Sequence, residues 1–294
     1  MAILFKRTDK LLPFATIILS IISILLLYSV SAMKFQYIRS DSYLIQSVAF
    51  GVGVLSAFII ALFDYRKFSK LWFIYLPIAI VFVVLTYTSM GVTVNGQRAW
   101  LNFKNIITFQ PSELLKIAFI LSFGYHLSLL GKKNMNKFSN FLVLCLHALV
   151  PIALVVAQKD DGTALVFIFI TAMMLIFAGL SWKYILSAVV VLPAVAMLLW
   201  VKVLTDYQKQ RFLIIFDLNK DPDGLGYQQL GAIKMIFSSG IFGKGLFKHN
   251  YDYLAEMDND FIFSFAAQAM GFIGCAIIVF LYIFILTRIL TNGF

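Results

Sequence analysis

Eight long apolar stretches are the feature that most constrains how this chain can fold. A helix needs about 20 consecutive apolar residues to cross the hydrocarbon core of a bilayer. The stretches fall at about 11–33, 42–63, 70–89, 110–130, 139–157, 163–181, 184–204 and 261–290. The sequence therefore predicts an all-α fold, a polytopic membrane helix bundle of about eight transmembrane helices.

The composition agrees with a membrane protein. Hydrophobic residues make up 61% of the 294 residues and charged residues 13%, whereas a soluble domain is about half apolar and a quarter charged. The net charge of +10 could indicate nucleic-acid binding. However, the basic residues are spread over short loops, where membrane orientation and anionic lipid headgroups explain them better. We therefore expect a membrane and no nucleic acid as partner.

Basic residues in short loops also predict the orientation, because they favour the cytoplasmic side. With the N-terminus in the cytoplasm, the cytoplasmic ends and loops hold more basic residues than the opposite loops, among them Lys6, Arg7, Arg66, Lys67, Lys132 and Lys133. An even number of helices returns the C-terminus to the same side. Both termini are therefore predicted to be cytoplasmic, with the first apolar stretch as an uncleaved helix.

Two polar segments then face outward. Residues 90–109 form a polar excursion rich in Gly, Asn and Thr, and residues 205–260 form a large extracytoplasmic loop between predicted helices 7 and 8. Connections of that length are uncommon and usually functional. Within the large loop, residues 227–242 are moderately apolar and predict a short interfacial or re-entrant helix.

Asp258 and Asp260 stand at the mouth of the last apolar stretch. Acids are costly inside hydrocarbon, so this pair is expected at a membrane surface, where lipid-linked substrates also lie. One carboxylate could cap the helix that follows. The other could act as a general base or hold a divalent cation.

Glu113 and Lys116 lie three residues apart near the start of the fourth stretch, so they share a helix face and can pair. The pair could simply fix the helix in its bundle, or it could line an internal cavity. Arg98 and Trp100 lie just before that stretch. Trp100 could anchor the chain at the interface, or it could stack on a sugar while Arg98 holds a phosphate.

Three further patterns are weaker. In the turn over 158–163, Asp161 or Thr163 could cap the sixth helix. Arg211, Lys244 and Lys248 could bind phosphate or remain solvated, since the surrounding glycines do not have P-loop spacing. The three histidines, His126, His147 and His249, lack the spacing of metal ligands. We find no nucleotide-binding motif, so a bond made outside the cell would need an activated substrate.

Four motifs together resemble the SEDS family, the family of RodA, FtsW and SpoVE. They are "NGQRAWLNF…FQPSELLKIA" over 95–118, "QKDDGTALVF" over 158–167, "GYQQLGAIKMIFSSGIFGKGL" over 226–246 and "EMDNDFIFSFAAQAMGFIG" over 256–274. The resemblance covers about residues 10–290 in the family's order. It implies a single SEDS-like membrane domain over residues 1–294, with 205–260 as its large loop.

The resemblance implies a peptidoglycan glycosyltransferase of the bacterial cytoplasmic (inner) membrane. Such an enzyme polymerises lipid II into glycan strands at the outer face, releases undecaprenyl pyrophosphate and works with a class B penicillin-binding protein. Its role in elongation, division or sporulation is not distinguished by the sequence. The resemblance implies no certain cofactor and leaves open a divalent cation on Asp260.

The resemblance also implies roles for individual residues. Asp260 matches the essential loop acid, which would take the proton from the 4-hydroxyl of the incoming GlcNAc. Trp100 matches the outer-loop tryptophan required for activity, and Glu113 and Lys116 match a pair that lines the central cavity. Further substrate-binding positions are predicted at Asp160, Arg211, Gln228 and Lys244.

The chain also departs from the family pattern. The family has ten helices, and this chain is expected to lack the last two. Gln268 and Ala269 stand where the family usually has two glutamates. Two alternatives therefore stay open: a flippase or transporter of lipid-linked sugars, and an inactive truncated scaffold that binds a penicillin-binding protein.

Overall fold

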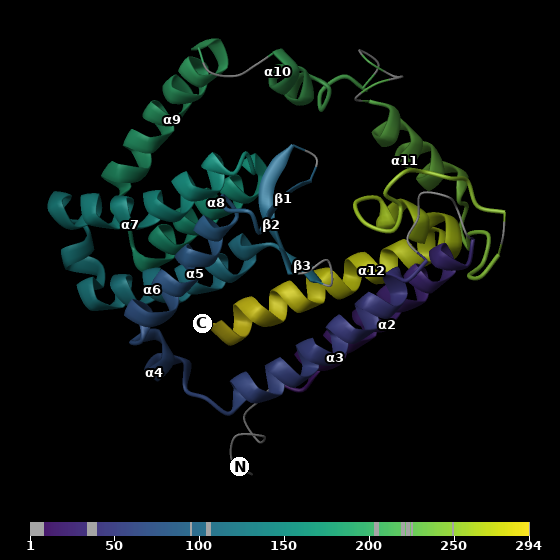
Figure 1. Cartoon of the computed structure of the whole chain (residues 1–294), viewed down its shortest axis with the longest axis horizontal. Coiled ribbons are helices and arrows are strands. Elements are labelled where there is room, and N and C mark those ends of the chain that lie inside the picture. The colour runs from purple at the N-terminus through teal and green to yellow at the C-terminus, as the bar shows by residue number, and fades with distance from the viewer. Residues whose placement is uncertain are drawn as a thin grey trace. The chain divides into compact units, whose positions relative to one another are not determined.

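The computed structural model describes residues 9–33, 40–94, 96–103, 107–202, 206–218, 221, 224, 226–248 and 250–293. Helices form most of this part of the chain (Figure 1). The chain divides into two compact units, unit 1 with Met1–Phe58 and Lys202–Phe294, and unit 2 with Ile59–Val201. Each unit is described by itself.

Unit 1 is built around two helices that pack side by side, α2 (Leu11–Ala32) and α12 (Ile262–Gly293) (Figure 1). Helix α3 (Ser42–Ala61) begins in this unit, which also holds α10 (Asp206–Leu213) and α11 (Tyr227–Ser238). Helix α11 packs on α12 and confirms the short helix predicted over 227–242. Val30, Met257 and Phe265 are fully buried in the core of this unit.

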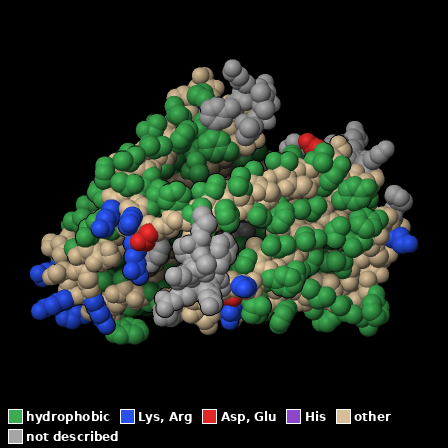
Figure 2. Space-filling model, turned by 90° about the horizontal axis from the view of Figure 1, so that it is seen from below, with side chains coloured by type: hydrophobic (Ala, Val, Ile, Leu, Met, Phe, Trp, Pro, Cys, Tyr) green, Lys and Arg blue, Asp and Glu red, His purple; other side chains and the backbone are tan. Residues whose placement is uncertain are grey.

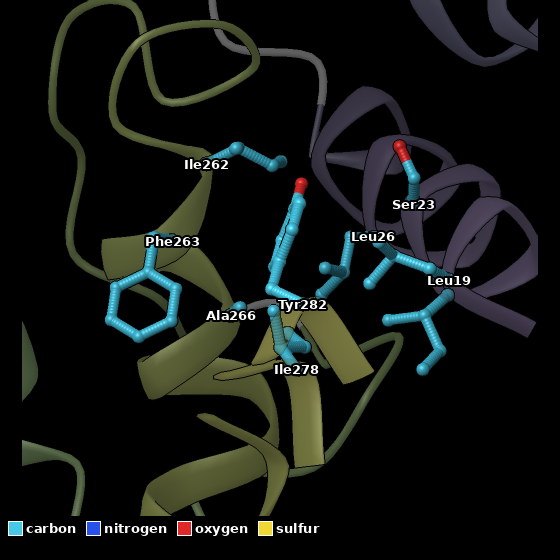
Figure 3. A pocket seen from close by; sticks show the side chains of 9 residues that line it. Leu19, Ser23, Leu26, Ile262, Phe263, Ala266, Ile278 and Tyr282 are labelled. Carbon is cyan, nitrogen blue, oxygen red and sulfur yellow. The ribbon is translucent and has the colours of Figure 1, made fainter. Parts of the chain in front are cut away.

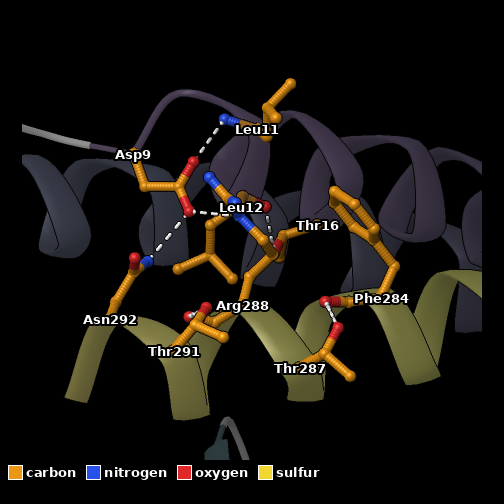
Figure 4. A network of polar contacts seen from close by, with 9 residues as sticks. All are labelled: Asp9, Leu11, Leu12, Thr16, Phe284, Thr287, Arg288, Thr291 and Asn292. Carbon is orange, nitrogen blue, oxygen red and sulfur yellow. Dashed lines mark hydrogen bonds and ion pairs between the residues drawn. The ribbon is translucent and has the colours of Figure 1, made fainter. Parts of the chain in front are cut away.

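A polar cluster ties the start of α2 to the end of α12 (Figure 4). The Asp9 carboxylate accepts hydrogen bonds from Arg288 Nε at 2.7 Å and from Asn292 Nδ2 at 2.8 Å. It also accepts one from the backbone N–H of Leu11 at 3.0 Å. The Arg288 hydrogen bond holds the pKa of Asp9 well below its usual range. The two helices are thus joined by charge at this end and by apolar packing along their length.

Helix α12 is broken at Gly271, whose φ of 66° and ψ of −165° are not helical. In an unbroken helix Ile262 and Tyr282 would lie about 30 Å apart, yet both line one groove against α2. The chain therefore folds back at Gly271, so that residues 262–270 form a short helix packed against the second half. The sequence predicted one long helix over 261–290, and the break corrects that prediction.

Unit 2 is a bundle of α5 (Trp72–Leu85), α6 (Pro111–Met135), α7 (Phe138–Ala157) and α8 (Asp161–Ala178). It also contains α4 (Tyr65–Ser69) and most of α9 (Trp182–Lys202). Its core is aromatic, since Phe119, Phe123 and Phe167 are all fully buried and in ring contact.

The polar excursion over 90–109 contains an antiparallel sheet of β1 (Gly91–Val94), β2 (Gln97–Phe103) and β3 (Ile107–Phe109), in that order. The register pairs Val92 with Trp100 and Leu101 with Phe109. Gly96, with φ +82°, supplies left-handed backbone between β1 and β2. The sequence predicted no strands here, so this small sheet is an addition to the helical fold.

The helices confirm a multi-pass membrane protein. Among the described residues, six are long and apolar enough to cross a membrane, namely α2, α3, α6, α7, α8 and α12. The other two predicted spans are the helices α5 and α9, of which α5 has only 14 residues. Hydrophobic side chains are spread widely over the face seen in Figure 2, as expected for contact with lipid.

Candidate active site

The break in α12 is filled by the loop that follows α11. The backbone N–H groups of Lys244 and Gly245 donate to Gln268 O at 2.7 Å and Ala269 O at 3.0 Å. Beyond the break, the N–H groups of Phe272 and Ile273 donate to carbonyls of the same loop, Gly240 O at 3.0 Å and Ile241 O at 3.2 Å. The loop therefore satisfies four backbone groups that the broken helix leaves free, as a membrane-embedded chain requires.

Two glycines allow this close approach. Gly243 has φ +71° and Gly271 has φ +66°, so both occupy left-handed backbone. A Cβ added to Gly271 would collide with Gly243 N and Ile241 O, and one added to Gly243 would collide with Gly271 N. Loop and helix can therefore meet only where both positions lack a side chain.

Asp260 lies two residues before α12 and is exposed. Within the described part of the chain its carboxylate forms no hydrogen bond or ion pair. Asp258 instead accepts a hydrogen bond from Ser42 Oγ at 3.1 Å. Neither carboxylate bonds the start of α12 among the described contacts, so the predicted cap is not found. Asp260 is left as a carboxylate open to a ligand.

Lys244 lies in a polar cluster beside the break. Its Nζ is 3.0 Å from Asp252 Oδ2 and donates to Asn250 O at 2.9 Å. Gln268, fully buried, donates from Nε2 to Asp252 Oδ2 at 2.6 Å and accepts from Asp252 N at 3.1 Å. The Lys244 hydrogen bond lowers the pKa of Asp252 below its usual range. An ionised glutamate at 268 could not donate this bond, which explains why glutamine fits this chain.

The other predicted residues of the large loop are less constrained. Gln228 lies in the first turn of α11 and is half-buried. Arg211 lies in α10, and its side chain falls outside the described residues. Their substrate-binding roles stay predictions.

In unit 2, Asp160 is the N-cap of α8 and is only 4% exposed. Its carboxylate accepts from Thr163 N at 3.1 Å and from Gln110 Nε2 at 2.6 Å. The capping prediction for this turn was therefore wrong in its residue, because the cap is Asp160 rather than Asp161 or Thr163. Asp160 joins the turn before α8 to the residue that precedes α6.

Arg98 and Trp100 lie on β2. The Arg98 guanidinium donates from Nε to Thr86 O and from Nη2 to Thr88 O, both at 3.0 Å. Its backbone N–H donates to Gln158 O at 3.1 Å. Arg98 thus pins the sheet to the end of α5, while Trp100 is half-buried opposite Val92.

Glu113 and Lys116 form the predicted ion pair on α6, with Lys116 Nζ 2.8 Å from Glu113 Oε1. The Glu113 side chain is 59% exposed and that of Lys116 is 23% exposed. The pairing is confirmed, and the lining of a cavity stays a prediction.

Two histidines whose sequence spacing suggested no contact lie side by side inside unit 2. His126 Nδ1 on α6 lies 3.1 Å from His147 Nδ1 on α7, and Ser122 Oγ lies 3.2 Å from His147 Nε2. They lie 21 residues apart in sequence and on different helices, so only the packing of α6 on α7 reveals the pair.

The predicted divalent cation finds little support from the residues around it. Among the described residues, no group of three or more His, Cys, Asp or Glu side chains could hold a metal ion. Calcium and magnesium sites need several oxygen ligands, and Asp260 offers one carboxylate. We therefore derive no step through a metal.

Comparison with known proteins identifies a family and several relatives of this chain. Residues 9–293 match the FtsW, RodA and SpoVE family, described as cell cycle protein. The chain is 33% identical over 221 residues to "Peptidoglycan glycosyltransferase MrdB" of Escherichia coli K12. This aligned region covers 74% of this chain and 59% of that protein. It is 29% identical over 296 residues to "Stage V sporulation protein E" of Bacillus subtilis 168, with 96% and 79% covered. The matched region thus spans about three fifths of the E. coli relative.

Two solved structures share the fold. One belongs to the study "Structural coordination of polymerization and crosslinking by a peptidoglycan synthase complex", with a TM-score of 0.77, 26% identity, and 96% of this chain and 77% of that chain covered. The other is the rod shape determining protein RodA of Thermus thermophilus, with a TM-score of 0.64, 24% identity, and 96% and 74% covered. At that identity the second match supports the fold alone.

Proposed function

This chain belongs to the FtsW, RodA and SpoVE family, and from that premise we propose that it is a peptidoglycan glycosyltransferase. Its substrate would be lipid II, polymerised into glycan strands at the outer face of the bacterial inner membrane, with both termini in the cytoplasm. The names of the relatives support the reaction, since they include peptidoglycan glycosyltransferases.

One observation carries the catalytic assignment. Asp260 is exposed and has no partner within the described part of the chain, while the helix that follows it is fixed by four backbone hydrogen bonds to the loop before it. A general base needs an accessible carboxylate on a rigid support. Asp260 meets both conditions, whereas Asp258 is engaged by Ser42.

The reaction follows from bond chemistry. The 4-hydroxyl oxygen of the acceptor GlcNAc attacks C1 of the donor sugar, opposite the pyrophosphate, and Asp260 takes the hydroxyl proton. The C1–O bond to the pyrophosphate breaks, which leaves undecaprenyl pyrophosphate and inverts an α-linkage to a β-1,4 bond. A positioned base contributes roughly 10²–10⁴-fold to such a rate.

The departing pyrophosphate needs positive charge. Lys244 is a candidate in unit 1, because it lies in the loop that fills the break in α12. It would exchange its contact with Asp252 for the phosphates. Trp100, Arg98, Glu113, Lys116, Asp160, Arg211 and Gln228 remain proposed substrate-binding residues.

The partner would be a class B penicillin-binding protein, which supplies crosslinking. This proposal is supported by the likeness to a chain from a study of a peptidoglycan synthase complex. Co-purification of a co-expressed penicillin-binding protein with this chain tests it, and recovery of the chain alone would count against it.

The enzyme is tested with purified lipid II and the full chain, with and without the penicillin-binding protein. We expect long glycan strands on a gel from the wild type, and none from Asp260→Asn. Asp258→Asn is the matched control, because asparagine can still accept from Ser42, and it should polymerise within about threefold of the wild type. Normal polymerisation by Asp260→Asn would remove the assignment.

The same preparations separate the alternatives. A flippase would move labelled lipid II across liposomes in a way that depends on the Glu113–Lys116 pair and not on Asp260. An inactive scaffold would co-purify with the penicillin-binding protein and make no polymer.

A further inference from the structure

An apolar groove of about 150 Å³ lies between α2 and the two halves of α12 (Figure 3). Its hydrocarbon walls come from both helices, from Leu19, Ile22 and Leu26 on α2 and from Ile262, Phe263, Ala266 and Ile278 on α12. Of its lining residues, Ser23 and Tyr282 supply the side-chain hydroxyls. Leu26, Ala266 and Ile278 are buried, so the base of the groove is closed by packed side chains.

The groove begins beside the proposed catalytic carboxylate. Asp260 precedes the lining residue Ile262 by two positions, and two residues of extended chain span at most about 7 Å. The fold-back at Gly271 is what brings Ile262 into the same groove as Tyr282. The groove therefore depends on the same break that holds the candidate site in place.

The size and lining suit a short length of hydrocarbon. A cavity of about 150 Å³ lined by Leu, Ile and Phe stays dry and can hold a benzene molecule. One isoprene unit has five carbons and is of similar size. In a prenyl-linked donor, only the two phosphates separate the reacting sugar carbon from the first isoprene unit, so that unit must lie close to Asp260.

We propose that this groove binds the first isoprene unit of the donor's prenyl chain, an inference that rests on the proposed glycosyltransferase function. Binding there holds the pyrophosphate, and with it the C1–O bond that breaks, at a fixed position relative to Asp260. The groove is thus a positioning site. The rest of the prenyl chain, beyond the first isoprene units, lies in the bilayer.

The test uses the purified full chain in phosphatidylcholine nanodiscs. The probe is a prenyl pyrophosphate with a diazirine on its first isoprene unit, and labelled peptides are identified by mass spectrometry. Ser23→Trp fills the groove from α2. Ile21→Trp is the matched control, because Ile21 is 47% exposed and does not line the groove. Ser23→Leu serves as a smaller filler if size-exclusion chromatography shows that Ser23→Trp misfolds.

We expect label on groove residues of both α2 and α12, displaced by undecaprenyl pyrophosphate and not by added phosphatidylglycerol. Because packing rather than transfer from water drives association in lipid, labelling should fall about fivefold in the filled variant and stay within about twofold in Ile21→Trp. Label elsewhere, equal displacement by phosphatidylglycerol, or unchanged labelling of both Ser23 variants would overturn the proposal.

Labelling requires no glycan synthesis, which separates this proposal from the function on which it rests. Asp260→Asn should label like the wild type while it makes no polymer. A wild-type chain that labels in the groove yet makes no polymer would refute the glycosyltransferase and leave the prenyl site supported. A chain that polymerises normally with Ser23→Trp and Ser23→Leu would refute the groove alone.

Discussion

The contact between Gly243 and Gly271 yields the sharpest prediction. In Gly271→Ala the new Cβ would overlap Gly243 N and Ile241 O, and the residue would have to keep φ at +66°. Because its ψ is −165°, this is backbone that essentially only glycine adopts, and an alanine there costs about 1–3 kcal/mol. The overlap also forces the loop away from α12, which breaks four backbone hydrogen bonds worth about 1 kcal/mol each. The expected loss in the free energy of unfolding is about 5 kcal/mol.

Gly240 is the matched control for this change. It has the same φ of +66°, but nothing lies within 4 Å of a Cβ added there. Gly240→Ala therefore measures the backbone strain without the overlap, about 1–2 kcal/mol.

The Tm of each variant is measured on the detergent-purified chain, with size-exclusion chromatography used to monitor thermal unfolding. At about 2–4 °C per kcal/mol for a chain of this size, Gly271→Ala should lower Tm by about 10–20 °C and Gly240→Ala by about 2–8 °C. Gly243→Ala should behave like Gly271→Ala. If Gly271→Ala and Gly240→Ala lower Tm equally, the loop does not hold the break and the reasoning fails.

Three further predictions concern the polar contacts. Gln268→Glu should lower Tm at neutral pH, since two carboxylates would face each other, and the deficit should shrink as acid protonates one of them; a deficit that does not change with pH would contradict this. The folded pKa of Asp252 is depressed by Lys244, so this contact stabilises the fold fully above about pH 4 and is lost as pH falls through the lower folded value. When Tm is measured over a pH series, it should fall at low pH in the wild type and fall less in Lys244→Met. An identical fall in both would exclude the contact as its cause. Asp160→Ala should cost about 2 kcal/mol by removing a helix cap and a buried hydrogen bond, whereas Asp160→Ser, which can still cap, should cost less; equal losses would argue against capping.

The helices were predictable because hydrocarbon thickness imposes a length and a composition on every span. All eight predicted stretches contain a helix, and residues 227–242 contain α11. The sheet over 90–109 was missed, although the dipeptide Asn95-Gly96 is a strong hairpin signal in the sequence. Arg98 and Trp100 were interpreted as interface residues, although their two-residue spacing also suits one face of a strand.

The break in α12 could not be found from the last apolar stretch alone. A single glycine such as Gly271 is common in membrane helices, and its cause is a loop about 30 residues earlier in the chain. The cap of α8 was misplaced by one residue because Asp160 and Asp161 are both good caps. The partner of Gln268 and the pairing of His126 with His147 depend on tertiary packing, which local patterns do not encode.

The Asp9–Arg288 contact has a mechanical consequence for the groove. It joins α2 to α12 at one end, and a second hydrogen bond from the Asn292 amide strengthens this contact. If the two helices separate to admit a branched hydrocarbon tail, they must pivot about this contact. The widest gap between them will then form toward Gly271. A prenyl chain would then enter sideways from the lipid, toward the end of the groove where Asp260 precedes the folded-back helix.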